Sequence, residues 1–222
     1  MMFKKILSAI FILIASLYCS NNSNNSNNSN NSNNSNSNDC ITIRGGGFSG
    51  FWYYYGYLQK NNITNKTIYC LSSGCLAYVA SIKYLNETYL YELANTLAIE
   101  YNNNNITKYE LKEKFINIIA NSISIENYNL NILTSNYLGQ CTIKKPTTVS
   151  ELIVALDETT NIPIITTKLN FSKNIDGVYC ITFINKCTRT ITLPYDYRIY
   201  SNIFNNKLTY DDVIYFLTYT NL

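Results

Sequence analysis

The sequence predicts an α/β fold in which a mostly parallel central sheet is covered by helices. Short apolar segments at Cys40–Arg44 and Thr67–Leu71 are typical of buried strands. Each of them runs into a turn of small residues, and each turn is followed by a helical pattern. Such alternation of strands and helices favours parallel strands with helices packed on them.

Capping residues and periodicity set the other expected elements. Asn86 is a typical helix N-cap, and Thr107 with Glu110 forms the Thr-x-x-Glu pattern of a capping box. The expected helices are Gly50–Lys60, Ser73–Lys83, the segment from Asn86 to Tyr101, Lys108–Asn121, Val149–Leu156 (capped by Thr148 with Glu151) and a last helix from Tyr210 (capped by Thr209 with Asp212). Later strands are expected at Ile162–Phe171 and, as a β pair, at Tyr179–Ile184 and Thr190–Leu193.

Composition divides the chain into three parts. Residues 1–20 carry Lys4 and Lys5 before an apolar run, which is the pattern of a signal peptide. The run is shorter than the roughly 20 residues that span a bilayer, and an uncleaved N-terminal anchor is the alternative. Residues 21–38 contain only Asn and Ser, so we expect a disordered linker. Residues 39–222 form one domain, expected to be secreted or to reside in the lumen of the secretory pathway.

The cysteines and the net charge indicate which bonds and binding sites to expect in this chain. Removal of Cys19 leaves an even number of cysteines, which indicates disulfides whose pairing stays open, although Cys180 and Cys187 are spaced to close a hairpin. The chain has no Cys-x-x-Cys, so we expect no metal site, and its net charge of +3 without a basic cluster gives no support to nucleic-acid binding. Asn-x-Ser/Thr acceptors are either glycosylation sites or chance in an Asn-rich chain: Asn62, Asn65, Asn86, Asn105 and Asn170.

A glycine loop and a serine turn carry the candidate chemistry. The first strand runs into Gly45-Gly46-Gly47-Phe48-Ser49-Gly50, and the second runs into Ser72-Ser73-Gly74. The chain contains no histidine, which excludes Ser-His-Asp and Cys-His hydrolases. A nucleophilic serine therefore requires a carboxylate as its base, held within hydrogen-bond reach and partly desolvated.

These motifs, Arg44–Gly50 followed by Leu71–Ala77, resemble those of the patatin-like phospholipases. The resemblance implies an α/β lipid acyl hydrolase with a Ser-Asp dyad and no cofactor. By position, Ser72 is the implied nucleophile and the amides of Gly45, Gly46 and Gly47 the implied oxyanion hole. The implied partner is a lipid or phospholipid, with a membrane surface as its source. Oligomeric state and lipid specificity are not readable from the sequence.

Three positions depart from the family's pattern. Cys70 stands where the serine turn has its first glycine, and Ser49 replaces a basic residue. The family's aspartate lies in an Asp-Gly-Gly/Ala motif after a helix that ends in small residues and proline. The Asp-Gly of this chain, Asp176-Gly177, precedes the candidate counterpart of that helix, Tyr210–Tyr219. Asp176 is nevertheless the best candidate base, because Asp157, Asp196, Asp211 and Asp212 are explained more simply as loop or cap residues. A chain that lacks its C-terminal part, and a catalytically inactive domain that binds lipid or protein, both stay open.

Other interpretations of the same residues are less well supported. Gly45-x-Gly47-x-x-Gly50 also fits a dinucleotide fingerprint, but no acidic residue follows before Glu87 to bind a ribose. Ser72 alone would be read as a helix cap. The aromatic run from Phe51 to Tyr55 is either an acyl-chain wall or membrane-facing patch, or a helix face packed on the sheet.

Overall fold

The computed structural model describes residues 39–61, 63, 65–82, 85–122, 128–162, 166, 173–180, 183, 187–205 and 208–219. The chain divides into two units, 1–36 and 37–222, and every described residue belongs to the second. The expected signal peptide (1–20) and linker (21–38) therefore lie outside the described residues.

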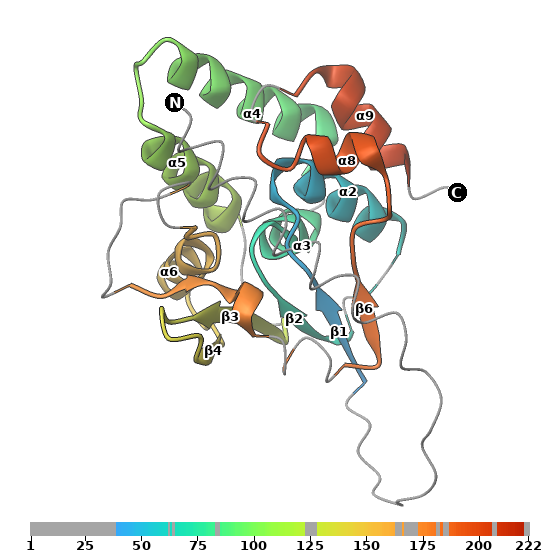
Figure 1. Ribbon diagram of the computed structural model, residues 1–222, viewed down its shortest axis with the longest axis vertical. Helices are drawn as coiled ribbons and strands as arrows, with labels where there is room; N and C mark the ends of the chain where they lie inside the picture. The colour runs from blue at the N-terminus through green and yellow to red at the C-terminus, as the bar shows by residue number, and fades with distance from the viewer. Residues whose placement is uncertain are drawn as a thin grey trace, which may run out of the picture. The chain divides into compact units, whose positions relative to one another are not determined.

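One mixed sheet organises the described residues, and most of its strands are parallel (Figure 1). Its strand order is β4-β3-β2-β1-β6. β1, β2, β3 and β6 run parallel to one another, while β4 and β5 run antiparallel to β3. The bounds are β1 Cys40–Ile43, β2 Thr67–Cys70, β3 Leu130–Ser135, β4 Cys141–Lys144, β5 Ile175–Asp176 and β6 Arg189–Ile191. The prediction of an α/β fold with a mostly parallel sheet is confirmed.

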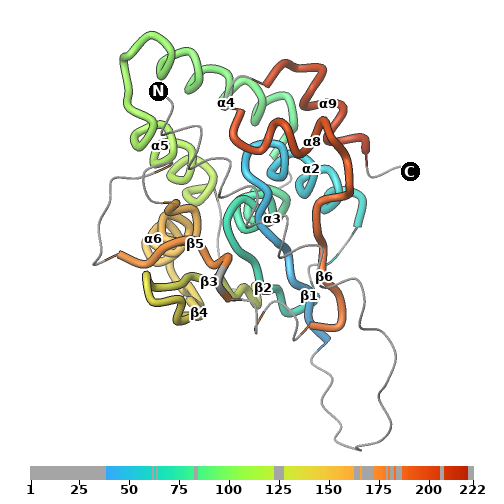
Figure 2. The backbone as a smooth tube through the Cα atoms, viewed as in Figure 1, coloured from blue at the N-terminus to red at the C-terminus, as the bar shows by residue number. Residues whose placement is uncertain are grey.

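The short strand β5 lies in line with the carboxyl end of β2. β2 pairs with β3 only as far as Ile132, and β5 pairs with β3 at Thr134 and Ser135 (Figure 2). The same two residues, Thr134 and Ser135, also pair with β4. A strand has two edges, so β5 must occupy the edge of β3 that β2 has left.

Helices flank the sheet, and several begin at the predicted caps. Asn86 accepts the Thr88 amide at the start of α4, and Thr107 and Thr209 form capping boxes with Glu110 and Asp212. The bounds are α2 Gly47–Lys60, α3 Ser73–Ile82, α4 Glu87–Asn102, α5 Lys108–Asn121, α6 Val149–Thr159, the 3-10 turn η1 Gly177–Tyr179, α8 Tyr197–Ser201 and α9 Tyr210–Thr218. Figure 1 shows α2, α8 and α9 grouped together, with α5 and α6 on the other side of the view.

The aromatic run of α2 is part of the core. Phe51, Trp52, Tyr53, Tyr54 and Tyr55 are all buried. Phe51 makes an edge contact with Phe115 of α5, and Tyr53 with Tyr219 after α9. The run is therefore a packed helix face, and its interpretation as a membrane-facing patch is wrong.

Disulfides fix three places in the sheet. Cys40 pairs with Cys187 at the amino ends of β1 and β6, Cys70 pairs with Cys75, and Cys141 pairs with Cys180. The expected link between Cys180 and Cys187 is wrong, because each of them is bonded to a strand of the sheet instead. These bonds indicate an oxidising environment.

The second half of the chain is less regular than predicted. Thr190 lies in β6, which pairs with β1, so the predicted β pair between Tyr179–Ile184 and Thr190–Leu193 is wrong where it is described. Much of the strand predicted at Ile162–Phe171 lies outside the described residues, and the described Thr166 amide donates to the Ile162 carbonyl in a turn. No helix in the described ranges is long and apolar enough to cross a bilayer.

Gly56 permits α2 to pack closely on α9. A Cβ at this position would lie 2.5 Å from the Leu217 carbonyl oxygen, which is a backbone atom that cannot simply rotate away. Alanine normally stabilises a helix interior by about 1 kcal/mol relative to glycine. Here overpacking, which typically costs about 1–3 kcal/mol, should outweigh that gain. We expect Gly56→Ala to lower the free energy of unfolding in urea denaturation, whereas Gln59→Ala, at an exposed position of the same helix, should change it little. An unchanged or higher value for Gly56→Ala would contradict this packing.

Candidate functional site

Ser72 lies in a tight turn between β2 and α3, and its backbone is left-handed. Its φ angle is +52°, in a region that non-glycine residues rarely adopt and that costs about 1–3 kcal/mol. The Gly74 amide donates to the Leu71 carbonyl (3.1 Å), and the Cys75 amide donates to the Ser72 carbonyl (3.0 Å). The turn thus reverses the chain from strand to helix within a few residues, which is the geometry of a nucleophile elbow.

Thr159, at the end of α6, binds the backbone of this turn. The Ser72 amide donates to the Thr159 hydroxyl (2.9 Å), and that hydroxyl donates to the Leu133 carbonyl of β3 (2.7 Å). Thr159 is fully buried and lies 87 residues away from Ser72 in the chain. The sequence does not predict this role for Thr159, because no local pattern distinguishes it from the other threonines.

Glycines allow two backbone segments, the glycine loop and the serine turn, to meet closely. A Cβ on Gly45 would lie 2.8 Å from the Ser72 Cβ and 3.4 Å from its Oγ. A Cβ on Gly74 would lie 2.3 Å from the Arg44 carbonyl oxygen. The structure therefore brings the glycine loop and Ser72 together at the carboxyl ends of the adjacent parallel strands β1 and β2.

The amides of the glycine loop differ in what they bind. The Gly46 amide donates to the Ser73 hydroxyl (3.0 Å), which ties the loop to the serine turn. Gly47 has a φ of +60°, and a Cβ there would lie 2.0 Å from the Ile203 carbonyl oxygen. Among the described residues, the Gly45 and Gly47 amides have no hydrogen-bond acceptor. These two N–H groups are the ones left to bind a ligand oxygen.

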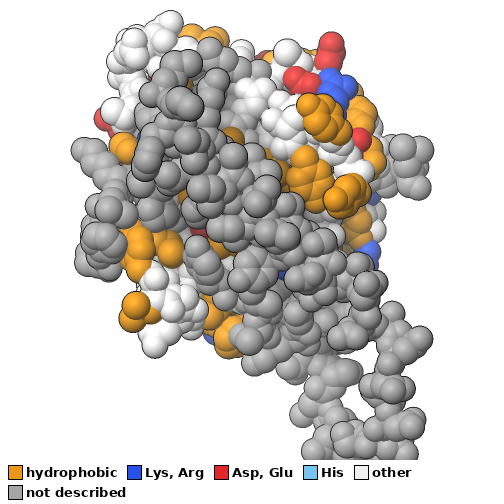
Figure 3. Space-filling model, viewed as in Figure 1, with side chains coloured by type: hydrophobic (Ala, Val, Ile, Leu, Met, Phe, Trp, Pro, Cys, Tyr) orange, Lys and Arg blue, Asp and Glu red, His pale blue; other side chains and the backbone are white. Residues whose placement is uncertain are grey.

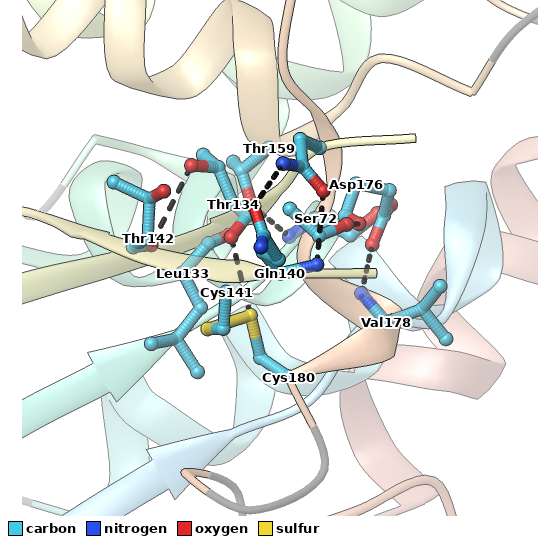
Figure 4. Close-up of a disulfide and its surroundings, with 12 residues drawn as sticks. Ser72, Leu133, Thr134, Gln140, Cys141, Thr142, Thr159, Asp176, Val178 and Cys180 are labelled. Carbon is cyan, nitrogen blue, oxygen red and sulfur yellow. Dashed lines mark hydrogen bonds between the residues drawn. A yellow bond between two sulfur atoms is a disulfide. The ribbon is translucent and has the colours of Figure 1, made fainter. Parts of the chain in front are cut away.

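Asp176 lies beside Ser72 (Figure 4), and the Ser72 hydroxyl lowers the pKa of its carboxyl as a hydrogen-bond donor does. The Val178 amide donates to the same carboxylate at Oδ1 (3.0 Å). The Asp176 backbone is held on both sides: its amide donates to the Asn161 carbonyl (3.0 Å), and its carbonyl accepts from the Ser135 hydroxyl (2.7 Å). Its position follows from β5, which continues the line of β2 past Ser72.

The Asp-Gly turn places this carboxylate close to the sheet. A Cβ on Gly177 would lie 2.3 Å from the Leu133 carbonyl oxygen, so a side chain here would push the turn away from β3. The turn is fastened a second time by the disulfide between Cys180 and Cys141 of β4 (Figure 4). Gly177 is therefore required by close approach, which explains why the aspartate sits in an Asp-Gly pair.

Burial makes Asp176 an unusually basic carboxylate. Desolvation raises its pKa from 3.8 to about 6, against the opposing effect of the hydrogen bonds from Ser72 and from the Val178 amide. No lysine or arginine forms an ion pair with it within the described part of the chain. A carboxylate in this state can accept a proton from a hydroxyl more readily than an exposed one can.

Three of the four other aspartates considered from the sequence have structural partners, and the fourth, Asp211, lies in the first turn of α9. Asp157 forms ion pairs with Lys112 and Lys173. Asp196 caps α8, and Asp212 caps α9 and binds Arg198. None of these three has a hydrogen bond to Ser72 in the described structure.

Two of the departures from the patatin-like pattern have local explanations. Ser49 is fully buried, and its hydroxyl donates to the Ile199 carbonyl of α8 (2.7 Å). A basic side chain at this position would bury an unpaired charge. The Cys70 side chain forms the disulfide with Cys75 of α3, and Ser72 lies between these two cysteines in the chain.

The described residues contain no group of three or more His, Cys, Asp or Glu side chains that could hold a metal ion. The arrangement instead provides a hydroxyl, a buried carboxylate and unpaired amides. Comparison of the chain with protein-family models, with curated proteins and with solved structures finds no match.

Proposed function

We propose that this protein is a patatin-like lipid acyl hydrolase that uses Ser72 as nucleophile and Asp176 as general base. The observation that carries the proposal is the position of Ser72 next to a buried carboxylate, at a left-handed turn beside a glycine loop. A helix cap would need neither the carboxylate nor the loop. The resemblance of both motifs to the patatin-like phospholipases supports the same chemistry.

The reaction follows from these groups. Asp176 takes the hydroxyl proton while Ser72 Oγ attacks the ester carbonyl carbon. The tetrahedral intermediate collapses, and the leaving alcohol takes the proton from Asp176 as the acyl–serine ester forms. Water then attacks that ester while Asp176 accepts its proton, and Asp176 returns the proton to Ser72 Oγ as the bond to the acyl carbon breaks and the fatty acid leaves.

The glycine loop suits the negative charge that develops on the carbonyl oxygen. The Gly45 and Gly47 amides have no acceptor among the described residues, so they can donate to this oxygen at no cost to existing hydrogen bonds. Each such donor typically contributes about 3 kcal/mol to the transition state. The Gly46 amide instead holds the loop in register with the turn through Ser73.

A lipid substrate is supported by the surface next to the loop. The Phe48 amide donates to the Ile203 carbonyl, which joins the loop to the segment after α8. Around this junction Phe48, Tyr195, Tyr197 and Phe204 are exposed. Figure 3 shows hydrophobic side chains gathered over α8 and α9. Aromatic side chains that expose one face suit contact with acyl chains and with the boundary of a lipid aggregate. The disulfides favour secretion as the route to such a substrate.

Ser72→Ala should abolish the hydrolysis of phospholipid vesicles and of a p-nitrophenyl ester, because the acyl–enzyme has no oxygen on which to form. The expected loss in kcat is at least about 10³-fold. Purified protein should also react with a fluorophosphonate probe at Ser72, as located by mass spectrometry. The matched control is Ser81→Ala, at a buried serine of α3, the helix that follows Ser72; its hydroxyl donates to the Tyr78 carbonyl.

The outcomes separate the two functions that the sequence leaves open. Loss in Ser72→Ala with full activity in Ser81→Ala supports hydrolysis. Wild-type protein that neither hydrolyses esters nor reacts with the probe would contradict it, and vesicle binding without turnover would then identify an inactive lipid-binding domain.

The rate should rise with pH through about 6, the pKa of Asp176, because only the ionised carboxylate accepts a proton. Asp176→Asn should lower kcat at every pH and remove this rise. A fluorometric assay from pH 4.5 to 8 on a non-ionising ester measures both. An unchanged rise in Asp176→Asn would assign the base to another residue.

The same carboxylate should make stability depend on pH, whether or not the protein is an enzyme. The pKa is higher in the folded than in the unfolded chain, so its contribution to stability is full below about 4 and is lost as pH rises through about 6. Asp176→Asn removes this loss. In urea denaturation the variant should be more stable than the wild type at pH 7, and the gap should narrow towards pH 4. A gap that is independent of pH would contradict the buried ionisation.

A further inference from the structure

We propose that the disulfide between Cys70 and Cys75 is the positioning device of the nucleophile, so that Ser72 is competent only while this bond is oxidised. The inference rests on the proposed function and deepens it, because it assigns the site a covalent, redox-sensitive support. Cys70 and Cys75 are positioning residues, since they act on Ser72 through the backbone.

The bond closes directly over the serine turn. Cys70 is the last residue of β2 and Cys75 lies in the first turn of α3, with their Cα atoms 5.0 Å apart. Ser72 lies between them in the chain. Both cysteines are fully buried, so the bridge is part of the packed interior and joins the end of the strand to the start of the helix.

Ser72 needs such support because its conformation is uncommon. A non-glycine residue keeps a left-handed backbone only where its surroundings determine it. The described restraints on the turn are the hydrogen bond from the Ser72 amide to Thr159, the bond from the Gly46 amide to the Ser73 hydroxyl, the two turn bonds at Gly74 and Cys75, and the disulfide. The hydrogen bonds can exchange with water when the turn opens, whereas the disulfide prevents Cys70 and Cys75 from separating at all.

The other two disulfides do not act on this turn. The bond between Cys40 and Cys187 lies at the amino ends of β1 and β6, opposite to the serine turn. The bond between Cys141 and Cys180 fastens the turn after Asp176, so it is not a neutral control. Removal of the Cys40–Cys187 bond is the matched control. The Cys40–Cys187 bond joins residues 147 positions apart, whereas the Cys70–Cys75 bond joins residues 5 positions apart. Loss of the Cys40–Cys187 bond should therefore lower the free energy of unfolding at least as much as loss of the Cys70–Cys75 bond.

The test compares Cys70→Ala/Cys75→Ala with Cys40→Ala/Cys187→Ala and the wild type, with unfolding midpoints measured for all three. Hydrogen exchange followed by mass spectrometry reports on residues 70–76, and p-nitrophenyl ester kinetics report on the nucleophile. We expect faster exchange over residues 70–76 in the first variant alone. We also expect its kcat to fall about 10-fold to 100-fold with KM unchanged, as for a misplaced reacting group.

Reversibility provides a second measurement in a variant that keeps only this bond, Cys40→Ala/Cys187→Ala/Cys141→Ala/Cys180→Ala. Dithiothreitol supplies two electrons and two protons and converts the disulfide into two thiols. The fluorophosphonate reaction at Ser72 should slow on reduction and recover on reoxidation. If this variant fails to fold, the comparison of double variants decides alone.

The outcomes distinguish this inference from the proposed function. Full kcat and unchanged exchange in Cys70→Ala/Cys75→Ala would overturn the positioning role and leave the hydrolase intact. Equal losses of kcat in both double variants would overturn it as well, because activity would then follow stability. A wild type without activity would overturn the hydrolase, and the exchange at residues 70–76 would still decide whether the disulfide holds the turn.

Discussion

The edge of β3 that β2 leaves free is the constraint on which the site depends. β2 stops pairing at Ile132, because the chain leaves the sheet to turn at Ser72. Leu133, Thr134 and Ser135 of β3 lie beyond that point, and β5 pairs with the last two of them. A strand in line with β2 must end beside the residue at which β2 departed. Asp176 therefore meets Ser72 as a result of sheet geometry, although more than one hundred positions separate them in the chain.

Two unfavourable features stand next to each other at this point. A left-handed serine costs conformational energy, and a buried carboxylate without a cation costs desolvation energy. Neighbouring groups offset both: Thr159 binds the serine amide, the Val178 amide binds the carboxylate, and Gly45 and Gly177 permit close approach. Strain and a perturbed pKa that coincide in this way favour function over packing as the reason for the arrangement.

Local patterns in the sequence predicted the early elements and the serine turn, because these depend on neighbours in the chain. β1, β2, α3 and the capped helices lie close to their predicted bounds. The sequence does not predict β3. The strand is buried along its whole length, but its polar residues Asn131, Thr134 and Ser135 interrupt the apolar pattern that is typical of a buried strand. β5 has two residues and no periodicity to detect. The Asp-Gly pair distinguishes Asp176 in the sequence. Its position beside Ser72 depends on the pairing of β5 with β3, which the sequence pattern does not predict.

Cys70 and Ser49 show how one steric constraint admits different chemical solutions. A glycine before the serine relieves crowding by removing a side chain, whereas Cys70 keeps its side chain and directs it into a bond with α3. The covalent solution restrains the turn more strongly, but only in an oxidising environment. Ser49 restrains the glycine loop through a buried hydrogen bond to α8. Because α8 and the residues after it also contact Gly47 and Phe48, the loop is held by packing on the second half of the chain. The site is thus an assembly of distant segments, and its geometry requires the whole described domain to be folded.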